Sequence, residues 1–440
     1  MTPTFGTDGV RGAAFSELTL DYVQRLGRVA VDVLTLTDVV VGRDTRESGP
    51  AFAEAIAAGA TSAGARVIDI GVAPTPAIAF VAQHLGCAGV SITASHNPHH
   101  DNGVKIFSVG GTKLLDSEQA RIERALHDDE PSSGTGVVDA SRRAELLGAY
   151  AAHVCAAVGD RALEGLTIVV DCANGAMSEV APEVIATLGA TVIVINDEPN
   201  GKNINEGCGA MHPELVGEAV RLHGAQLGLA FDGDGDRVIA VDHQGDVVDG
   251  DHLIALAALD AKERGHLEGG VVVTVMTNAG FHRAMREAGI EVVTTAVGDR
   301  NVLAAMDERG FVLGGEQSGH VIHARHATTG DGLLAGVILA AMVRRKGRSL
   351  RELARSAMTP LPQALVNVRV AQRVHDPMSV MQEDVRDAQQ RLGATGRVLL
   401  RASGTESMVR VMVEAETQAL ADEMAESLAD VVAERFGAVR

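Results

Sequence analysis

The stretch TIVVDCANG, residues Thr167–Gly175, joins a run of apolar, β-branched residues to a polar turn. Such a run is typical of a buried β-strand, and the Ala-containing stretch near Ser178–Leu188 that follows it predicts a helix. A second apolar run, TVIVIN at Thr191–Asn196, completes a strand–helix–strand unit. Strands that alternate with helices in this way predict an α/β fold with largely parallel sheets.

The same unit occurs three times along the chain. An earlier copy begins with VVVGRD at Val39–Asp44, and a later copy begins with VVVTVMTNAG at Val271–Gly280. Each copy is followed by a short apolar strand that ends in a polar loop: TASHNP (Thr93–Pro98), DGDGDR (Asp232–Arg237) or GEQSGH (Gly315–His320). Ligands bind at the carboxyl ends of strands in open α/β sheets. We therefore expect three related domains that contribute these loops to one shared cleft.

The pattern changes toward the C-terminus. Pro360 and Pro362 indicate a hinge, and the alternating run Val366–Val370 predicts a half-buried strand. A helix, two strands and a last helix follow and complete a small α+β domain. The expected fold is thus three similar α/β mixed-sheet domains plus a small α+β C-terminal domain, arranged around one central cleft. The expected domains are residues 1–152, 153–252, 253–364 and 365–440.

The composition excludes several classes of protein. Apolar residues make up 46% of the 440 residues and charged residues 22%, which is typical of a globular chain. With 38 Lys and Arg against 58 Asp and Glu, the net charge of −20 argues against a nucleic-acid partner. The longest apolar run, Leu333–Val343, is shorter than the ~20 residues that span a bilayer, so no membrane partner is expected.

Four cysteines indicate the compartment. They lie far apart and contain no C-x-x-C pair, which fits neither a zinc site nor a disulfide framework. Free cysteines suit a reducing compartment, and we expect a cytoplasmic protein. The cysteines are Cys87, Cys155, Cys172 and Cys208.

The DGDGDR loop indicates a metal site. Asp232, Asp234 and Asp236 alternate with glycines, and carboxylates this close repel one another unless a cation neutralises them. Oxygen ligands favour Mg²⁺ or a similar hard ion. An EF-hand that begins at Asp232 needs Gly at its sixth position and Glu at its twelfth, where Arg237 and His243 stand, so that interpretation fails. A solvated acidic turn is the alternative.

The TASHNP loop places Ser95 and His96 at a predicted strand end. A serine there can be a nucleophile or a phosphoryl carrier if a metal and cations offset the charge, whereas a simple cap is the alternative. Lys105 favours the first interpretation, because it follows ten residues later and is one of only five lysines in the chain. His96, His99 and His100 lack the Cys or H-x-x-x-H partners of a zinc site.

Two further segments carry polar groups that suit a ligand. RASGTES followed by MVR predicts a tight turn with two hydroxyls and two guanidiniums, which suits a phosphate dianion, although a plain hairpin is the alternative. GEQSGH offers hydrogen-bonding groups that suit hydroxyls or an amine, and a plain polar loop is the alternative. Arginines of FGTDGVRG and VGRDTR are weak signals taken singly. The candidates are Arg401, Ser403, Gly404, Thr405 and Arg410 in the turn and Glu316, Ser318 and His320 in the loop. The weak signals are Arg11, Arg43 and Arg46, because most surface arginines are solvated.

Taken in order, these motifs resemble those of the α-D-phosphohexomutase superfamily. FGTDGVRG, TASHNP-x-x-DNGVK, DGDGDR, GEQSGH, TTGDG and R-x-SGTE extend from Phe5 to Glu406. GEQSGH together with TTGDG (Thr328–Gly332) resembles the glucosamine branch more than the glucose or mannose branches. The prolines that usually flank the phosphate turn in the family are Ala402 and Ser407 here.

The resemblance implies a role for each motif. Ser95 would be a phosphoserine, and one Mg²⁺ would be bound by an oxygen of that group together with the three aspartates of DGDGDR. The loop GEQSGH would read the sugar, and the RASGTES turn would grip the phosphate that does not react. Around the reacting phosphate the resemblance places Arg11, Lys105 and Arg237, with Lys105 or His96 transferring the proton.

The implied activity interconverts glucosamine 6-phosphate and glucosamine 1-phosphate through a glucosamine 1,6-bisphosphate, with a hexose 1,6-bisphosphate as activator. The product would supply UDP-N-acetylglucosamine and so cell-wall synthesis, and a homodimer is expected. One alternative is a mutase for glucose or mannose phosphates. Another is a metal-dependent sugar phosphatase with Asp232 as nucleophile, because an apolar strand followed by D-x-D begins haloacid-dehalogenase-type enzymes. A non-catalytic sugar-phosphate-binding protein is a third.

Overall fold

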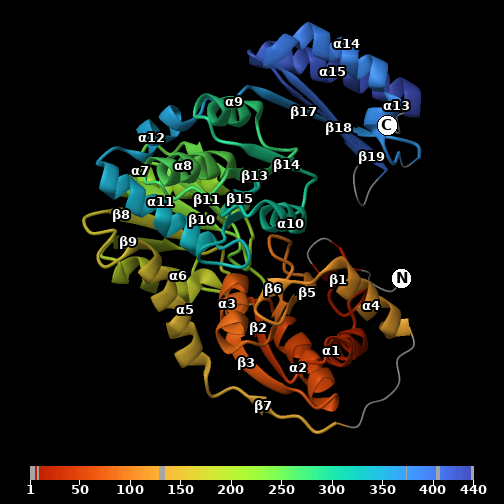
Figure 1. Ribbon diagram of the computed structural model, residues 1–440, viewed down its shortest axis with the longest axis vertical. Helices are drawn as coiled ribbons and strands as arrows, with labels where there is room; N and C mark the ends of the chain where they lie inside the picture. The colour runs from red at the N-terminus through yellow and green to blue at the C-terminus, as the bar shows by residue number, and fades with distance from the viewer. Residues whose placement is uncertain (1–4, 7–8, 128–133, 373, 403–406, 438–440) are drawn as a thin grey trace. The chain divides into compact units, whose positions relative to one another are not determined.

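The chain forms two compact units in the computed structural model, which describes residues 5–6, 9–127, 134–372, 374–402 and 407–437. Unit 1 comprises residues 1–276 and 289–357, and unit 2 comprises residues 277–288 and 358–440. Of the four sheets that the described residues form, three belong to unit 1 and one to unit 2. Most of their strands are labelled in Figure 1.

The first sheet has a parallel centre and an antiparallel edge. Its order is β1-β5-β4-β2-β3-β7, with β6 paired to β5. β2 runs parallel to β3 and β4, whereas β5 runs antiparallel to β4 and β1. The strands are β1 (Val10–Ala13), β2 (Asp38–Arg43), β3 (Arg66–Val72), β4 (Ala88–Ile92), β5 (Asp101–Ser108), β6 (Thr112–Lys113) and β7 (Val138–Asp139).

The second and third sheets are smaller, with orders β12-β11-β10-β8-β9 and β14-β13-β15-β16. Each again has three parallel strands and an antiparallel edge. The strands are β8 (Thr167–Asp171), β9 (Thr191–Ile195), β10 (Leu227–Phe231), β11 (Val238–Asp242), β12 (Val247–Val248), β13 (Val271–Thr274), β14 (Val292–Thr295), β15 (Leu313–Gly315) and β16 (Val321–His323).

The three sheets of unit 1 share one topology, which confirms the repeat predicted from the sequence. In each, the first strand of the repeat (β2, β8 or β13) lies between the second (β3, β9 or β14) and the third (β4, β10 or β15). The fourth strand then pairs antiparallel with the third. The three polar loops follow the equivalent strands β4, β10 and β15, so each loop leaves its sheet at a carboxyl end.

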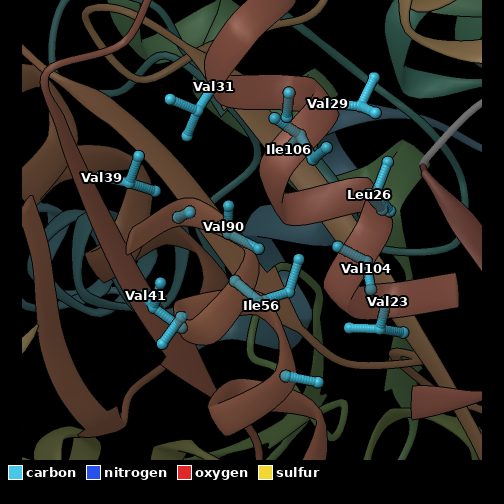
Figure 2. Close-up of a cluster of buried hydrophobic side chains, with 14 of the residues drawn as sticks. Val23, Leu26, Val29, Val31, Val39, Val41, Ile56, Val90, Val104 and Ile106 are labelled. Atoms are coloured by element: carbon cyan, nitrogen blue, oxygen red, sulfur yellow. The ribbon is translucent and has the colours of Figure 1, made fainter. Parts of the chain in front are cut away.

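Aliphatic side chains form the core beside the first sheet, as expected for a chain without Trp. They come from β2, β4 and β5 and from the helices α1 (Leu20–Leu34) and α2 (Gly49–Ser62). These helices pack closely at Gly59, where a Cβ would lie only 1.9 Å from the Gln24 carbonyl oxygen. Figure 2 labels Val23, Leu26, Val29, Val31, Val39, Val41, Ile56, Val90, Val104 and Ile106 of this core.

Helix α11 (Gly332–Lys346) is the most buried helix beside the second and third sheets, with eleven of its fifteen residues buried. It packs against β10, β11 and β16, and Asp331 caps its N-terminus by accepting from Leu334 N. The other helices of unit 1 are α3 (Thr75–Leu85), α4 (Asp116–His127), α5 (Arg143–Val158), α6 (Met177–Thr187), η1 (Gly209–Met211), α7 (Pro213–His223), α8 (Gly250–Glu263), α10 (Asp299–Arg309) and α12 (Leu350–Ala357).

Unit 2 is a three-stranded antiparallel sheet, β17-β19-β18, packed against helices. The short helix α9 (Ala279–Glu287) also belongs to it, because Ala279 N donates to the buried Glu414 carboxylate and the Asn278 side chain bonds both backbone groups of Leu361. The remaining elements are β17 (Gln363–Arg369), α13 (Pro377–Val380), α14 (Gln382–Leu392), η2 (Gly393–Thr395), β18 (Arg397–Ala402), β19 (Met408–Glu414) and α15 (Gln418–Phe436).

The predicted fold class is confirmed: three similar mixed α/β sheets and a small α+β part at the C-terminus. Among the residues that the structure describes, no helix combines the length and apolarity needed to cross a membrane.

Candidate active site

The three polar loops of unit 1 meet at one place. Ser95, after β4, donates its hydroxyl to Asp232 Oδ2, after β10, at 2.5 Å. The third loop joins them through Val238 N, which donates to the Gly319 carbonyl at 3.1 Å. Gly332 N, in the TTGDG motif, donates to the Gly235 carbonyl at 3.0 Å. The loops after β4, β10 and β15 lie far apart in the sequence, yet they form one site. They do so because each follows the equivalent strand of its sheet.

Ser95 is held in an unusual conformation. Its φ of +54° lies in the left-handed region, where a residue with a Cβ is strained by about 1–3 kcal/mol. Its backbone N donates to Thr93 Oγ1 at 2.9 Å, and its side chain is fully buried. The hydroxyl is thereby aimed at the carboxylates of the DGDGDR loop.

The three aspartates of that loop form a buried cluster. Asp232, Asp234 and Asp236 are each at most 3% exposed, and one carboxylate oxygen from each lies within 4.8 Å of the others. Burial, together with the charges of Asp236 and Asp234, raises the pKa of Asp232 well above its usual range. Placing several carboxylates in such a site costs on the order of several kcal/mol per charge unless cations compensate.

Lys105, from β5, supplies one compensating charge. Its buried ammonium lies 2.8 Å from Asp234 Oδ2 and 2.8 Å from Asp236 Oδ2. Burial raises the pKa of Asp236, but Lys105, His320 and Arg237 outweigh that effect and hold it well below the usual range. Within the described part of the chain, Asp234 Oδ1 and Asp236 Oδ1 remain buried without a hydrogen-bond donor. These oxygens fit a hard divalent cation, which prefers carboxylate ligands.

A cavity of about 390 Å³ opens beside this cluster. Its walls carry both positively and negatively charged side chains. Besides Asp236, they include four of the predicted site residues. It is lined by Gly6, Gly9, Arg11, Asp236, Arg237, Val297, Gly298, Asp299, Glu316 and His320. A larger cavity of about 500 Å³, between α5, α8 and α11, contains none of the predicted site residues.

Two histidines lie beside Ser95 and the aspartate cluster, and their pKa values are shifted in opposite directions. His96 Nδ1 lies 3.4 Å from Ser95 Oγ, and burial with the nearby Arg237 and Arg11 lowers its pKa to about 4. Burial also disfavours a charged His320, but Asp236 and Asp299 outweigh it and raise the pKa of that ring. At neutral pH, His96 is therefore a neutral group near the serine hydroxyl.

The loop GEQSGH is held against the start of α8. Gly250 N donates to the Gln317 carbonyl at 3.0 Å, and a Cβ at Gly250 would lie 2.2 Å from the Glu316 carbonyl oxygen. Glu316 faces the cavity and accepts from Gly298 N at Oε1. The structure places His320 there as well, but Ser318 is exposed and does not line the cavity.

The predicted phosphate turn lies in unit 2. Arg401 of β18 and Arg410 of β19 are directly paired across the two antiparallel strands. The predicted residues Ser403, Gly404 and Thr405 lie outside the described residues.

Several residues at the site were missed by the sequence reasoning. Asp299 lines the cavity and pairs with Lys113 at 2.7 Å, a contact that the scarcity of lysine could have flagged. Arg46, interpreted as an ordinary loop arginine, is only 1% exposed and bonds the loop that carries Ser95. Asn205 Nδ2 donates to the carbonyls of Ser95 and Asn97. No local sequence pattern indicates that Arg46 or Asn205 would bond the loop that carries Ser95.

Sequence comparison defines the class of protein to which this fold and site belong. Four domain models of the phosphoglucomutase/phosphomannomutase family match the chain in order: the alpha/beta/alpha domains I, II and III over residues 2–132, 149–245 and 249–361, and the C-terminal domain over residues 365–431. The chain belongs to the phosphoglucomutase/phosphomannomutase family and is an enzyme of the mutase class.

Within this family the chain is similar over its whole length to proteins named phosphoglucosamine mutase. The one from Rhodococcus opacus is 49% identical over 441 residues, covering 98% of this chain and 99% of the relative. The one from Corynebacterium diphtheriae is 49% identical over 450 residues, covering 98% of this chain and 100% of the relative.

Solved structures share the fold. A phosphoglucomutase/phosphomannomutase family protein from Burkholderia thailandensis has a TM-score of 0.82 at 24% identity, covering 98% of each chain. The N-acetylphosphoglucosamine mutase of Aspergillus fumigatus, solved in complex with GlcNAc-6P and magnesium, has a TM-score of 0.69 at 21% identity, covering 99% of this chain and 96% of that one.

Proposed function

We propose that the enzyme interconverts glucosamine 6-phosphate and glucosamine 1-phosphate through a phosphoserine at Ser95 and a glucosamine 1,6-bisphosphate. The observation that carries this proposal is the contact between the Ser95 hydroxyl and Asp232 at the edge of a charged cavity. A serine so placed can carry a phosphoryl group if cations offset its charge. The names of the full-length relatives support glucosamine as the sugar.

The buried aspartates are the proposed site of one Mg²⁺. Asp232, Asp234 and Asp236, with an oxygen on Ser95, would hold it, and the oxygens of Asp234 and Asp236 that lack a donor among the described residues support this assignment. A bound Mg²⁺ stabilises negative charge on a transferring phosphoryl group. Related structures solved with magnesium and with glucose 1,6-bisphosphate support both the metal and a hexose bisphosphate as activator.

Side chains of this chain account for the remaining steps. The bond between Ser95 Oγ and phosphorus breaks as the sugar's free hydroxyl oxygen bonds to that phosphorus, which gives the bisphosphate. Arg11 and Arg237 in the cavity wall stabilise the charge on the phosphoryl oxygens. The sugar hydroxyl gives its proton to His96, which is neutral because its pKa is lowered to about 4. Ser95 Oγ, which leaves phosphorus, takes its proton from the Lys105 ammonium or from His96. The bisphosphate then returns its other phosphoryl group to Ser95.

Selectivity for an amino sugar is assigned to the third loop. Glu316 brings a carboxylate to the cavity, where it can bind an ammonium group, and Ser318 and His320 belong to the same loop. The turn that contains Arg401, Ser403, Gly404, Thr405 and Arg410 would hold the second phosphate.

The wider setting also stays a proposal. The product would supply UDP-N-acetylglucosamine synthesis in the cytoplasm. We keep the homodimer and the division into domains at residues 1–152, 153–252, 253–364 and 365–440 as predictions, which size-exclusion chromatography with light scattering and limited proteolysis can test.

Phosphorus NMR tests the proposed reaction directly. The full chain with Mg²⁺, glucosamine 6-phosphate and a trace of glucose 1,6-bisphosphate should produce a sugar 1-phosphate signal. Parallel reactions with glucose and mannose 6-phosphates measure the preference among sugars. Release of inorganic phosphate in place of the 1-phosphate would contradict the proposal and make the enzyme a phosphatase.

A further inference from the structure

Arg46 uses every N–H of its guanidinium on groups around Ser95. Nη2 donates to the carbonyls of Ser95 and Asn97 at 2.9 and 2.8 Å. Nη1 donates to the carbonyls of Pro98 and, at 3.0 Å, Asp101. Nε donates to Asp44 Oδ2 at 2.9 Å, so five donors meet five acceptors. A buried arginine so fully bonded is a rigid support for the loop that it contacts.

Asp44 closes this network on the other side of Ser95. Its Oδ2 accepts from Thr93 Oγ1 at 2.6 Å, and Thr93 Oγ1 in turn accepts from Ser95 N at 2.9 Å. Asp44 Oδ1 also accepts from Arg46 N at 3.0 Å. Both the N–H and the carbonyl of Ser95 are therefore tied to the same buried ion pair, whose two side chains are fully shielded from solvent.

The backbone of Ser95 requires such support. A serine at a φ of +54° leaves the left-handed region unless surrounding bonds hold it there. If it relaxed, the hydroxyl would no longer point at Asp232, 2.5 Å away. Asn205, from the loop after β9, adds a second support, because its Nδ2 donates to the carbonyls of Ser95 and Asn97 at 2.9 and 3.1 Å.

We infer that Arg46 is a positioning residue, which holds the backbone of Ser95 so that its oxygen stays aligned with the DGDGDR loop through each phosphoryl transfer. The inference rests on the proposed function in one respect, namely that Ser95 carries the phosphoryl group. Arg46 exchanges no proton and breaks no bond; it acts through the carbonyls of the loop. Lysine cannot replace it, because a single ammonium offers three donors and lacks the planar fork that spans these carbonyls.

The first experiment compares Arg46→Lys with the wild-type enzyme. Arg43→Lys is the control, because it alters a partly buried arginine of the same VGRDTR motif that makes none of these bonds within the described residues. We expect kcat of Arg46→Lys to fall about 100-fold with KM changed less than about threefold, since a misplaced reacting group loses rate rather than ground-state binding. Arg43→Lys should stay within about twofold of wild type.

Hydrogen exchange gives a readout that does not depend on turnover. In Arg46→Lys, the amides of residues 95–97 and 99–101 should exchange at least about tenfold faster, while the amides of α1 and α2 keep their protection. If the wild type lacks mutase activity, the proposed function fails, and this exchange result still decides the positioning role. Exchange and kcat equal to those of Arg43→Lys would overturn the inference.

Asn205 provides a second variant in case Arg46→Lys does not fold. Asn205 has a φ of +57°, which glycine adopts readily, so Asn205→Gly removes the two hydrogen bonds without backbone strain. We expect kcat to fall about tenfold with little change in KM or melting temperature. A purely structural role would instead lower the melting temperature and leave kcat per folded molecule unchanged, which would also contradict the inference.

Discussion

Ser95 Oγ and Asp232 Oδ2 lie 2.5 Å apart, although 137 positions separate the two residues in the chain. The contact joins the ends of β4 and β10, which occupy equivalent places in two sheets of the same topology. It brings the candidate phosphoryl carrier to the first of three buried carboxylates. The repeated fold thus builds the site by placing loops of different sequence at the same structural position.

Ser95→Ala should abolish turnover and leave the fold intact. Among the described residues, the hydroxyl bonds two side chains of the site, Asp232 and His96, so its loss leaves the core unchanged. The proposed reaction has no other atom to carry the phosphoryl group. We expect kcat to fall by on the order of 10⁴-fold or more in the phosphorus NMR assay, with an unchanged circular dichroism spectrum. Turnover within tenfold of wild type would contradict the role of Ser95.

Asp232→Asn should stabilise the metal-free protein and remove its response to Mg²⁺. Burial and two neighbouring carboxylates raise the pKa of Asp232, so its charged form opposes folding at neutral pH, and an amide removes that charge while still accepting from Ser95. In EDTA we expect a gain of about 1–3 kcal/mol in unfolding free energy. Mg²⁺ at 100 times its Kd should add about 2.7 kcal/mol to the wild type only.

Thermal melts with EDTA and with Mg²⁺ measure both effects. Asp160→Asn, an exposed aspartate of unit 1, is the matched control and should behave as wild type in both conditions. A metal response in Asp232→Asn equal to that of the wild type would show that the ion binds elsewhere.

Glu316→Gln should reduce the preference for amino sugars. Gln keeps an oxygen for the bond from Gly298 N but loses the negative charge that faces the cavity. A hydrogen bond to a charged group contributes about 1.5–3 kcal/mol, so kcat/KM for glucosamine 6-phosphate should fall roughly 10- to 100-fold. Glucose 6-phosphate has no ammonium and serves as the internal control. An equal loss on both sugars would assign Glu316 a role other than selectivity.

Asp331→Asn should change how stability depends on pH. Burial raises the pKa of Asp331 to about 6, so the folded protein keeps a proton that the unfolded chain releases near pH 4. Stability contributed by this group therefore falls as pH rises from about 4 to 6, by up to about 3 kcal/mol. Asn still accepts from Leu334 N and from the Tyr150 hydroxyl, without the buried charge.

Melting temperatures from pH 4 to pH 8 measure this difference. The variant should exceed the wild type at pH 7–8 and approach it near pH 4. Parallel curves for the two proteins across this range would show that Asp331 does not titrate as its burial implies.

The repeat and the site loops could be read from the sequence because both depend on local patterns. Apolar β-branched runs predict buried strands. Clustered carboxylates such as those of DGDGDR predict a functional loop, because they repel one another and do not stabilise the fold. The strand order of the three sheets then confirmed that TASHNP, DGDGDR and GEQSGH end equivalent strands. Local patterns do not say which side chains of a loop line the cavity: Glu316 and His320 do, and Ser318 does not.

By itself, therefore, the sequence determined the α/β repeat, the family and the loops that carry reactive groups. Only the tertiary structure decided which side chains meet: Lys105 between two aspartates, Asp299 with Lys113 at the cavity, and Arg46 beneath Ser95. Strand and helix patterns arise from neighbours within about ten residues, whereas these contacts join positions that come together only when strands pair and sheets pack. Arg46 differs from a solvated arginine in its acceptors, which are four backbone carbonyls and the Asp44 carboxylate.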